Sequence, residues 1–402
     1  MTRPSLTAVI LNCVVITMMF AVGGCSEDPA AAAAAAAVAN APQGWSALGE
    51  GPPAVWSERR ETPKEVHALF VDPKGYLYTG GDLEVVGKWD GTAWIPVPGE
   101  FMSVVHTFAM YDDGRDPAMY TVKAGDRYGM HLWRWNSQNQ KWIIQDEPAK
   151  GILKDEPIEG EVLKLLSFEF GGKDVLLAGG MMTIKFPEDI DPRGGALFQW
   201  DGERWNTFAN TGFDGGIGDM TLLDGDLVVA GSFRRLAVGR RQQTVNRIAV
   251  FDGGQWTALG SGIEGYTVEA LAVVDQADGP VLYAAGQFES AGGQPARNIA
   301  RWDGEKWQEV GGGIDGPVNA LAVLETSAGP VLYAGGRFSN AGSTPANNIA
   351  AWDGQKWSAL GEGVNEPVYA LTTGLGKNLL YVGGAFTEAG GKPAKTVAQW
   401  KP

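Results

Sequence analysis

A stretch near the carboxyl end decides the fold: VNAL at residues 318–321, VLYAGGRF at 331–338 and NIAAWDGQKW at 348–357. Its last tryptophan marks a position that recurs along the chain, at Trp45, Trp94, Trp142, Trp205, Trp256, Trp307 and Trp357. The steps between these markers are 49, 48, 63, 51, 51 and 50 residues. Seven markers at this spacing indicate one structural unit repeated seven times.

Each repeat contains four short runs of strand-forming residues. The third run ends in an aromatic residue and the fourth carries the marker tryptophan. Aspartate followed by glycine separates these two runs at Asp90-Gly91, Asp201-Gly202, Asp252-Gly253, Asp303-Gly304 and Asp353-Gly354. Because both residues of this pair tolerate positive φ, it predicts a tight hairpin between antiparallel strands.

Four antiparallel strands repeated seven times predict an all-β fold, a seven-bladed β-propeller over residues 44–402. A single four-stranded sheet leaves its faces exposed, whereas blades stacked in a ring cover one another. This region begins with a lone fourth strand around Trp45 and ends with a lone third strand around Trp400. We therefore expect the N- and C-terminal strands to close one blade together.

The tryptophans fit this arrangement as blade core. Thirteen of the 15 occupy third-run or fourth-run positions, and only Trp56 and Trp133 lie elsewhere. We expect them to pack between blades rather than to form a ligand platform.

The motifs also resemble those of known repeats. LYAAGQFESAGG at 282–293, followed by NIARWDGEKW at 298–307, is similar to kelch-like propeller repeats, including the galactose-oxidase central-domain type, and to repeats of a fungal cortical polarity-marker family. The resemblance covers residues 44–402 and is strongest in the last three copies. It implies the fold and no particular activity.

The amino terminus is predicted to be a targeting signal. Residues 1–24 have Arg3, then an apolar run, and end in Val22-Gly23-Gly24 before Cys25, which resembles a bacterial lipobox. The resemblance implies a lipid on Cys25. Ser26, the residue after the lipidated cysteine, resembles that of lipoproteins sorted to the outer membrane. Residues 25–43 are alanine-rich and predict a tether. A plain signal peptide with an accidental cysteine is the alternative.

Composition excludes several classes of protein. The formal charge is −15, which argues against a nucleic-acid partner because that requires clustered cations. Two cysteines and three histidines exclude a disulfide scaffold and a Cys/His metal cluster. The resemblance to galactose oxidase would otherwise imply a copper site with a Tyr–Cys crosslink. This chemistry is excluded because the only cysteine of the mature chain is Cys25, at its expected lipid-bearing end. No catalytic motif is present, so we expect neither enzymatic activity nor a cofactor.

Binding is the expected role, through loops at one end of the blades. One loop carries Arg234, Arg235, Arg240, Arg241 and Arg247, which could recognise carboxylate or phosphate groups. A solvated loop paired with local acids is the alternative. Two other long loops stand out, one with Trp56, Arg59 and Arg60 and one rich in acids at 146–161.

A second candidate site is the ring formed by the second residue of each first strand. Its members are His67, His106, Leu163, Glu269, Asn319 and Tyr369, and the fourth repeat aligns ambiguously around Asp219. We expect a polar channel mouth that holds a small ligand, or else only hydrated channel lining. We expect no bound metal, because a sheet spacing of about 10 Å would keep His67, His106 and Glu269 apart.

Together these features predict a monomeric, lipid-anchored extracytoplasmic protein, placed at the outer membrane, that binds a protein or an envelope glycan through its loop face. The first alternative is an extracytoplasmic enzyme acting on a carbohydrate or similar ligand. The second is a structural envelope protein.

Overall fold

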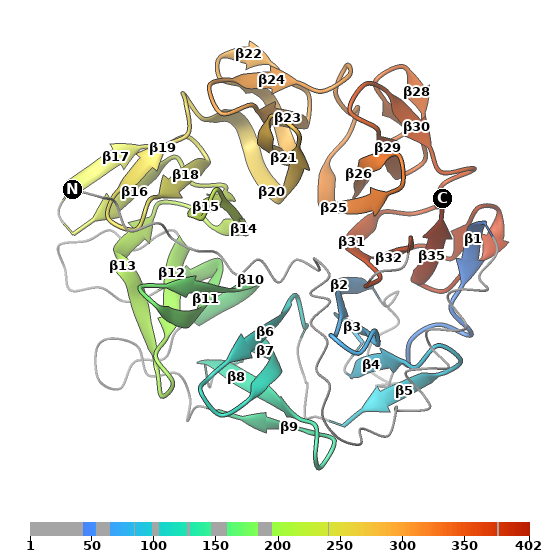
Figure 1. Ribbon diagram of the computed structural model, residues 1–402, viewed down its shortest axis with the longest axis horizontal. Coiled ribbons are helices and arrows are strands. Elements are labelled where there is room, and N and C mark those ends of the chain that lie inside the picture. The colour runs from blue at the N-terminus through green and yellow to red at the C-terminus, as the bar shows by residue number, and fades with distance from the viewer. Residues whose placement is uncertain are drawn as a thin grey trace.

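The computed structural model describes residues 43–53, 65–83, 85–98, 104–126, 129–145, 159–183, 195–239, 241–375 and 378–402. All the elements in these ranges are β-strands, and they form seven antiparallel blades around a central axis (Figure 1). The predicted seven-bladed β-propeller is therefore confirmed. Within the same ranges there is no helix long and apolar enough to cross a membrane.

Each blade has four strands that run in order from the axis to the rim. The first three blades are β2(Val66–Val71), β3(Leu77–Gly81), β4(Val86–Trp89), β5(Trp94–Val97); β6(Phe108–Asp112), β7(Pro117–Asp126), β8(Gly129–Asn136), β9(Lys141–Ile144); and β10(Glu159–Phe170), β11(Lys173–Thr183), β12(Gly195–Trp200), β13(Trp205–Phe213). The next three are β14(Ile217–Leu223), β15(Asp226–Gly231), β18(Ile248–Phe251), β19(Trp256–Ala258); β20(Ile263–Gln276), β21(Gly279–Ala291), β23(Ile299–Trp302), β24(Trp307–Glu309); and β25(Val318–Thr326), β26(Gly329–Gly336), β29(Ile349–Trp352), β30(Trp357–Ala359).

The last blade joins the two ends of the propeller. Its strand order is β31(Val368–Thr373), β32(Leu380–Gly384), β35(Val397–Lys401) and β1(Gly44–Ala47). Trp45 of β1 pairs with Trp400 of β35 in an antiparallel register. The predicted closure of one blade by the N- and C-terminal strands is confirmed.

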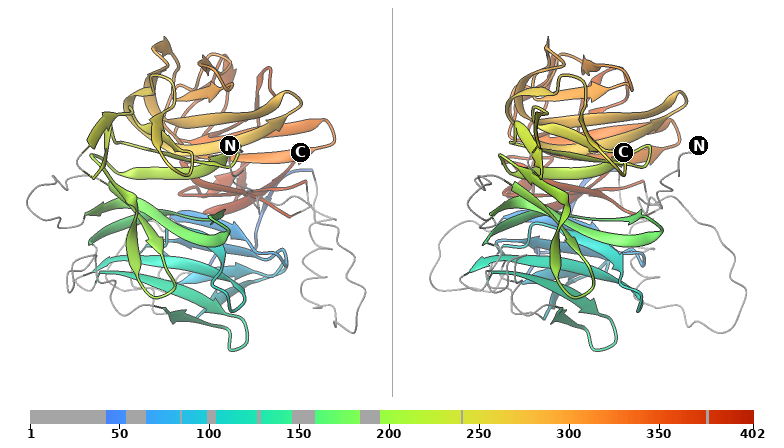
Figure 2. Two further views of the ribbon diagram at one scale, coloured as in Figure 1. Left: turned by 60° about the vertical axis from the view of Figure 1, so that its left-hand side comes forward. Right: turned by 90° about the vertical axis from the view of Figure 1, so that its left-hand side faces the viewer.

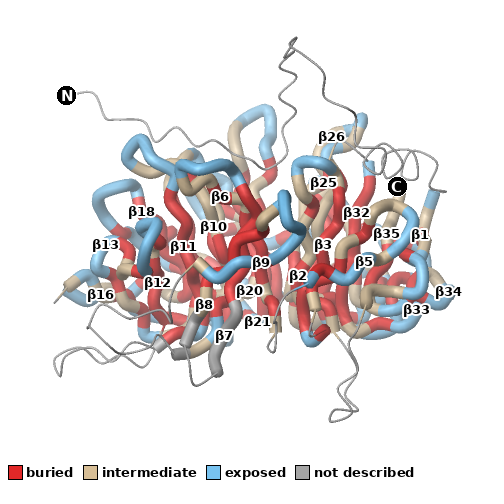
Figure 3. The backbone as a smooth tube through the Cα atoms, turned by 90° about the horizontal axis from the view of Figure 1, so that it is seen from below, coloured by how far each residue is buried: buried red, intermediate tan, exposed pale blue. Residues whose placement is uncertain are grey.

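Short hairpins and longer loops lie at opposite ends of the strands. Hairpins between the first and second strands and between the third and fourth strands form one face, which we call the hairpin face. Connections between the second and third strands, and from the fourth strand to the next blade, form the other, which we call the loop face. The side views in Figure 2 show the blades stacked around the axis. Figure 3 shows buried residues within the strands and exposed ones at their ends.

The glycine pair in the second strand of most blades has a packing reason. The strands LYTGG (β3) and LYVGG (β32) are buried at every position, because neighbouring blades cover both of their faces. A Cβ at Gly335 would lie 2.5 Å from Cγ1 of Val368 in the next blade. A side chain at this position would therefore push adjacent blades apart.

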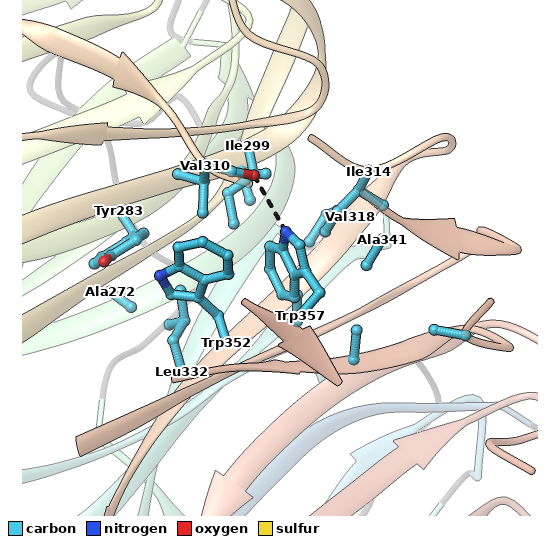
Figure 4. Close-up of a cluster of buried hydrophobic side chains, with 14 of the residues drawn as sticks. Ala272, Tyr283, Ile299, Val310, Ile314, Val318, Leu332, Ala341, Trp352 and Trp357 are labelled. Carbon is cyan, nitrogen blue, oxygen red and sulfur yellow. Dashed lines mark hydrogen bonds between the residues drawn. The ribbon is translucent and has the colours of Figure 1, made fainter. Parts of the chain in front are cut away.

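The aromatic pairs form the outer core of the blades. Trp352 and Trp357 face each other across β29 and β30 with ring centroids 5.2 Å apart. The indole N–H of Trp357 donates to the carbonyl oxygen of Val310 in the preceding blade at 3.1 Å (Figure 4). Trp357 thus pairs within its own blade and also bonds to the preceding blade, as expected for a residue of the blade core.

The Asp-Gly turns differ in detail from the predicted tight hairpin. Trp352 pairs directly with Trp357, so four residues form the loop between them. Gly354 has a φ of 94°, whereas Asp353 is not at positive φ. The Asp353 carboxylate instead accepts hydrogen bonds from the backbone N–H groups of Gln355 and Lys356. The aspartate acts through its side chain rather than through a left-handed backbone.

Candidate functional site

The predicted ring at the channel mouth is a ring of β-bulges. In β2, Val66 pairs with Gly81 and Ala68 with Gly80, which leaves His67 without an opposing residue. The same irregularity recurs in the first strands at Leu163, Gly218, Glu269, Asn319 and Tyr369. The fourth-blade member is therefore Gly218 rather than Asp219. A bulge redirects a side chain, and all these residues are half-buried, as is His106 just before β6.

Four members of the ring form a continuous arc over four consecutive blades. The His67 ring stacks on that of Tyr369 at 5.0 Å between centroids and lies 5.4 Å from that of His106. The side-chain amide of Asn319 donates to the carbonyl oxygen of Val368 at 2.8 Å. The expected separation of about 10 Å is therefore wrong for the two histidines. First strands converge on the axis, and long side chains close the remaining distance.

His67 also belongs to a cluster within its own blade. Its Nε2 lies 3.4 Å from Oε2 of Glu65, and Asp82 offers a further carboxylate within 4.8 Å of both. Burial lowers the pKa of His67 and of His106. Burial, together with the charge of Asp82, raises the pKa of Glu65. The cluster thus combines a neutral imidazole with two carboxylates that repel each other.

Glu269 lies on another part of the ring and is not brought to the histidines. Burial raises its pKa, and so does the charge of Asp219, against a hydrogen bond from Thr267. The Asp219 carboxylate accepts the backbone N–H of Leu271 at 2.8 Å and lies 2.7 Å from Nζ of Lys164. Asp219 thereby links three successive blades, which is a structural role.

The arginine-rich loop forms a β-hairpin. Strands β16(Arg235–Val238) and β17(Arg241–Thr244) extend the edge of the preceding blade, where β16 pairs with β13. The hairpin therefore lies at the rim, away from the ring of first strands (Figure 1).

The arginines of this hairpin differ in their surroundings. Arg235 pairs with Asp214, with 3.2 Å between Nε and Oδ2, and Arg234 donates its backbone N–H to the same carboxylate. Arg247 is buried and donates to the carbonyl oxygens of Ile263 and Tyr266, so it is structural. Arg234, Arg235 and Arg241 are exposed.

A polar cavity that the sequence did not predict lies between the last two blades on the loop face. Its volume is about 740 Å³. Its lining includes Arg337, Phe338, Asn347, Glu362, Asn365 and Glu388. Burial, the larger effect, raises the pKa of Tyr369, and the charge of Arg337 lowers it. Arg337 thus lines the cavity and also acts electrostatically on a residue of the ring.

A repeat position could have indicated both Asp82 and Arg337. Each directly follows the second glycine of the second strand, Gly81 and Gly336, and that glycine pairs opposite the bulge. Asp82 lies beside the bulge residue His67, and Arg337 lines the cavity.

Several predicted features lie outside the described residues. These are Cys25 with its signal and tether segments at 1–42, Trp56, Arg59 and Arg60, residues 146–158 of the acidic loop, and Arg240. Trp133, which the repeat pattern left unassigned, is buried in β8.

No protein-family model matches the chain, and no curated protein matches it either. The geometry defines its class as a seven-bladed β-propeller with a polar ring and a polar cavity on its loop face. Such an arrangement is consistent with a ligand-binding module.

Proposed function

We propose that this protein is an extracytoplasmic lipoprotein, anchored in the outer membrane through Cys25, whose kelch-like propeller binds a protein or an envelope glycan through its loop face. The observation that carries the proposal is the cavity between the last two blades. Its amides, carboxylates and guanidinium group provide donors and acceptors. Hydroxyl-rich ligands such as glycans are recognised by such mixtures of groups.

The anchor is supported by the sequence alone. The run Val22-Gly23-Gly24-Cys25 follows an apolar segment, and the residues up to the propeller form a tether. Several acyl chains on one cysteine hold a protein firmly on a membrane. The propeller would act as a monomer, because its seven blades close on themselves. The net charge of −15 argues against a nucleic-acid partner.

A carbohydrate-active enzyme is the rival proposal. Glu362 and Glu388 both line the cavity, and a pair of carboxylates is the usual machinery of glycoside hydrolysis. Release of reducing ends from a bound envelope polysaccharide, lost in Glu362→Gln, would favour the enzyme. Binding without turnover would favour the module.

A glycan array and a pull-down of envelope fractions test the binding proposal. The probe is the 44–402 fragment, which contains every strand of the closed ring. Arg337→Ala with Glu388→Ala should weaken binding by about tenfold or more, since each polar partner contributes roughly 1 kcal/mol. Lys356→Ala, exposed on the hairpin face, is the matched control. Equal binding by both variants would exclude the cavity as the site.

A further inference from the structure

The inner corner of the first blade holds Glu65, His67 and Asp82 in a fixed arrangement. Glu65 and His67 flank Val66, whose side chain is fully buried. The backbone N–H of Asp82 donates to the carbonyl oxygen of Glu65 at 3.1 Å. A Cβ on Gly81 would lie 2.1 Å from the same oxygen, so only glycine allows this approach. The backbone therefore fixes the distances between the Cα atoms of the three residues.

The ligand atoms of these side chains have the spacing of a metal site. Zinc–ligand bonds of about 2.0–2.1 Å place two ligand atoms of a tetrahedral site roughly 3.4 Å apart. Oε2 of Glu65 and Nε2 of His67 are 3.4 Å apart, and one atom from each of the three residues lies within 4.8 Å of the others. Small side-chain rotations would bring all three onto one ion.

The next blade offers His106 as a candidate fourth ligand. Two imidazoles on one tetrahedral zinc ion have ring centroids roughly 5 Å apart, given the same bond lengths. The centroids of His67 and His106 are 5.4 Å apart. Tyr369 stacks on the ring of His67 and limits its orientation. The contact between the rings removes the reason for which the sequence argued against a metal.

The two carboxylates of this cluster also favour a bound cation. Among the described residues, no lysine or arginine forms an ion pair with Glu65 or Asp82. Glu65 is half-buried, and His67 is its ion-pair partner only when protonated. Two carboxylates beside an imidazole suit a divalent transition metal. Ca²⁺ and Mg²⁺ prefer oxygen ligands throughout.

We propose that Glu65, His67 and Asp82 bind one zinc-type divalent cation at the channel mouth, with His106 as its fourth ligand. The ion would bridge the first two blades on the loop face, near the ring residue Tyr369. This site is separate from the cavity between the last two blades.

Zinc binding by the untagged full-length protein in detergent tests the proposal. The protein is stripped with a chelator, incubated with ZnCl₂, desalted and analysed for metal. The wild type should retain one zinc ion per chain. It should melt at a higher temperature with zinc than without, because the ion binds the folded state. His67→Ala and Asp82→Asn should each lose this stoichiometric zinc and the zinc-dependent shift in Tm.

Glu269→Gln is the matched control, because it removes a carboxylate from the equivalent bulge of another blade. It should retain zinc as the wild type does. Asp82 is exposed in a turn, so Asp82→Asn keeps the test valid if His67→Ala fails to fold. Co²⁺ in place of zinc should give the visible absorption of a tetrahedral site, lost in His106→Ala. No zinc on the folded wild type, or equal zinc on Asp82→Asn, would overturn the proposal.

Discussion

Trp45 and Trp400 pair across β1 and β35 with ring centroids 5.3 Å apart, although they lie at opposite ends of the propeller sequence. The cross-strand aromatic pairs of the other blades have centroid distances between 5.1 Å and 5.6 Å. The indole N–H of Trp45 also donates to the carbonyl oxygen of Leu360 in the preceding blade at 2.5 Å. The closing blade is therefore built in the same way as the continuous ones.

Removing the closing strand should destabilise the whole ring. Deletion of residues 396–402 takes away β35 and exposes the apolar surface of β32. The deletion also removes Val397, which is fully buried, and Trp400, which is partly buried against the core. Loss of such core contacts costs about 3 kcal/mol or more, a large part of the stability of a typical domain. We expect a lower Tm in a thermal melt followed by circular dichroism. Deletion of 30–37, which precedes β1, is the control, and an unchanged Tm in the 396–402 deletion would refute the closure.

Lipid attachment should depend on Cys25 alone. Cells supplied with labelled fatty acid should label the wild-type protein and not Cys25→Ser. Cys13→Ser is the matched control, because Cys13 lies in the segment expected to be removed. Label that persists in Cys25→Ser would contradict the lipoprotein proposal.

The rim hairpin should contribute to binding of an anionic partner. Arg240→Glu with Arg241→Glu reverses two charges on the loop, and affinity for a carboxylate-rich or phosphate-rich ligand should fall with no change in Tm. Lys306→Glu with Lys356→Glu makes the same change of charge on the hairpin face and should not weaken binding. Equal affinity in the wild type and in both double variants would indicate that the loop is only a solvated surface.

Acid should weaken the β6–β7 hairpin through Asp113. Burial alone would raise the pKa of Asp113, but hydrogen bonds from Arg115 and Tyr120 outweigh it and lower the pKa from 3.8 to about 2. A lowered pKa in the folded state stabilises the protein above about pH 4, and this contribution is lost as the pH falls through about 2.

Asp113→Asn should therefore reduce the free energy of unfolding at neutral pH. Its difference from the wild type should shrink between about pH 4 and pH 2. Denaturant titrations at several pH values measure this difference. Asp278→Asn, an exposed carboxylate on the β20–β21 hairpin, should show little difference at any pH. A difference for Asp113→Asn that stays constant down to pH 2 would contradict the assignment.

Much of the fold could be predicted from local pattern. The spacing of Trp307 and Trp357, the glycine pairs and the Asp-Gly turns repeat because every blade meets the same neighbours. The two partial blades at Trp45 and Trp400 could be matched because the last blade lacks a fourth strand and the segment at Trp45 is a fourth strand without a blade. Their pairing then follows from the need to leave no open edge.

The sequence by itself determined the repeat, the number of blades, the closure and the polar ring, because periodic burial controls all four. Only the tertiary structure decided which ring residues meet. Bulges redirect the side chains, and blades converge on the axis, so His67 contacts His106 and Tyr369, while Glu269 does not join them. Packing also brings Asp82 beside His67 at the mouth and places Arg337 in the cavity between the last two blades. Distances between blades depend on packing across the ring, which no local pattern in one repeat records.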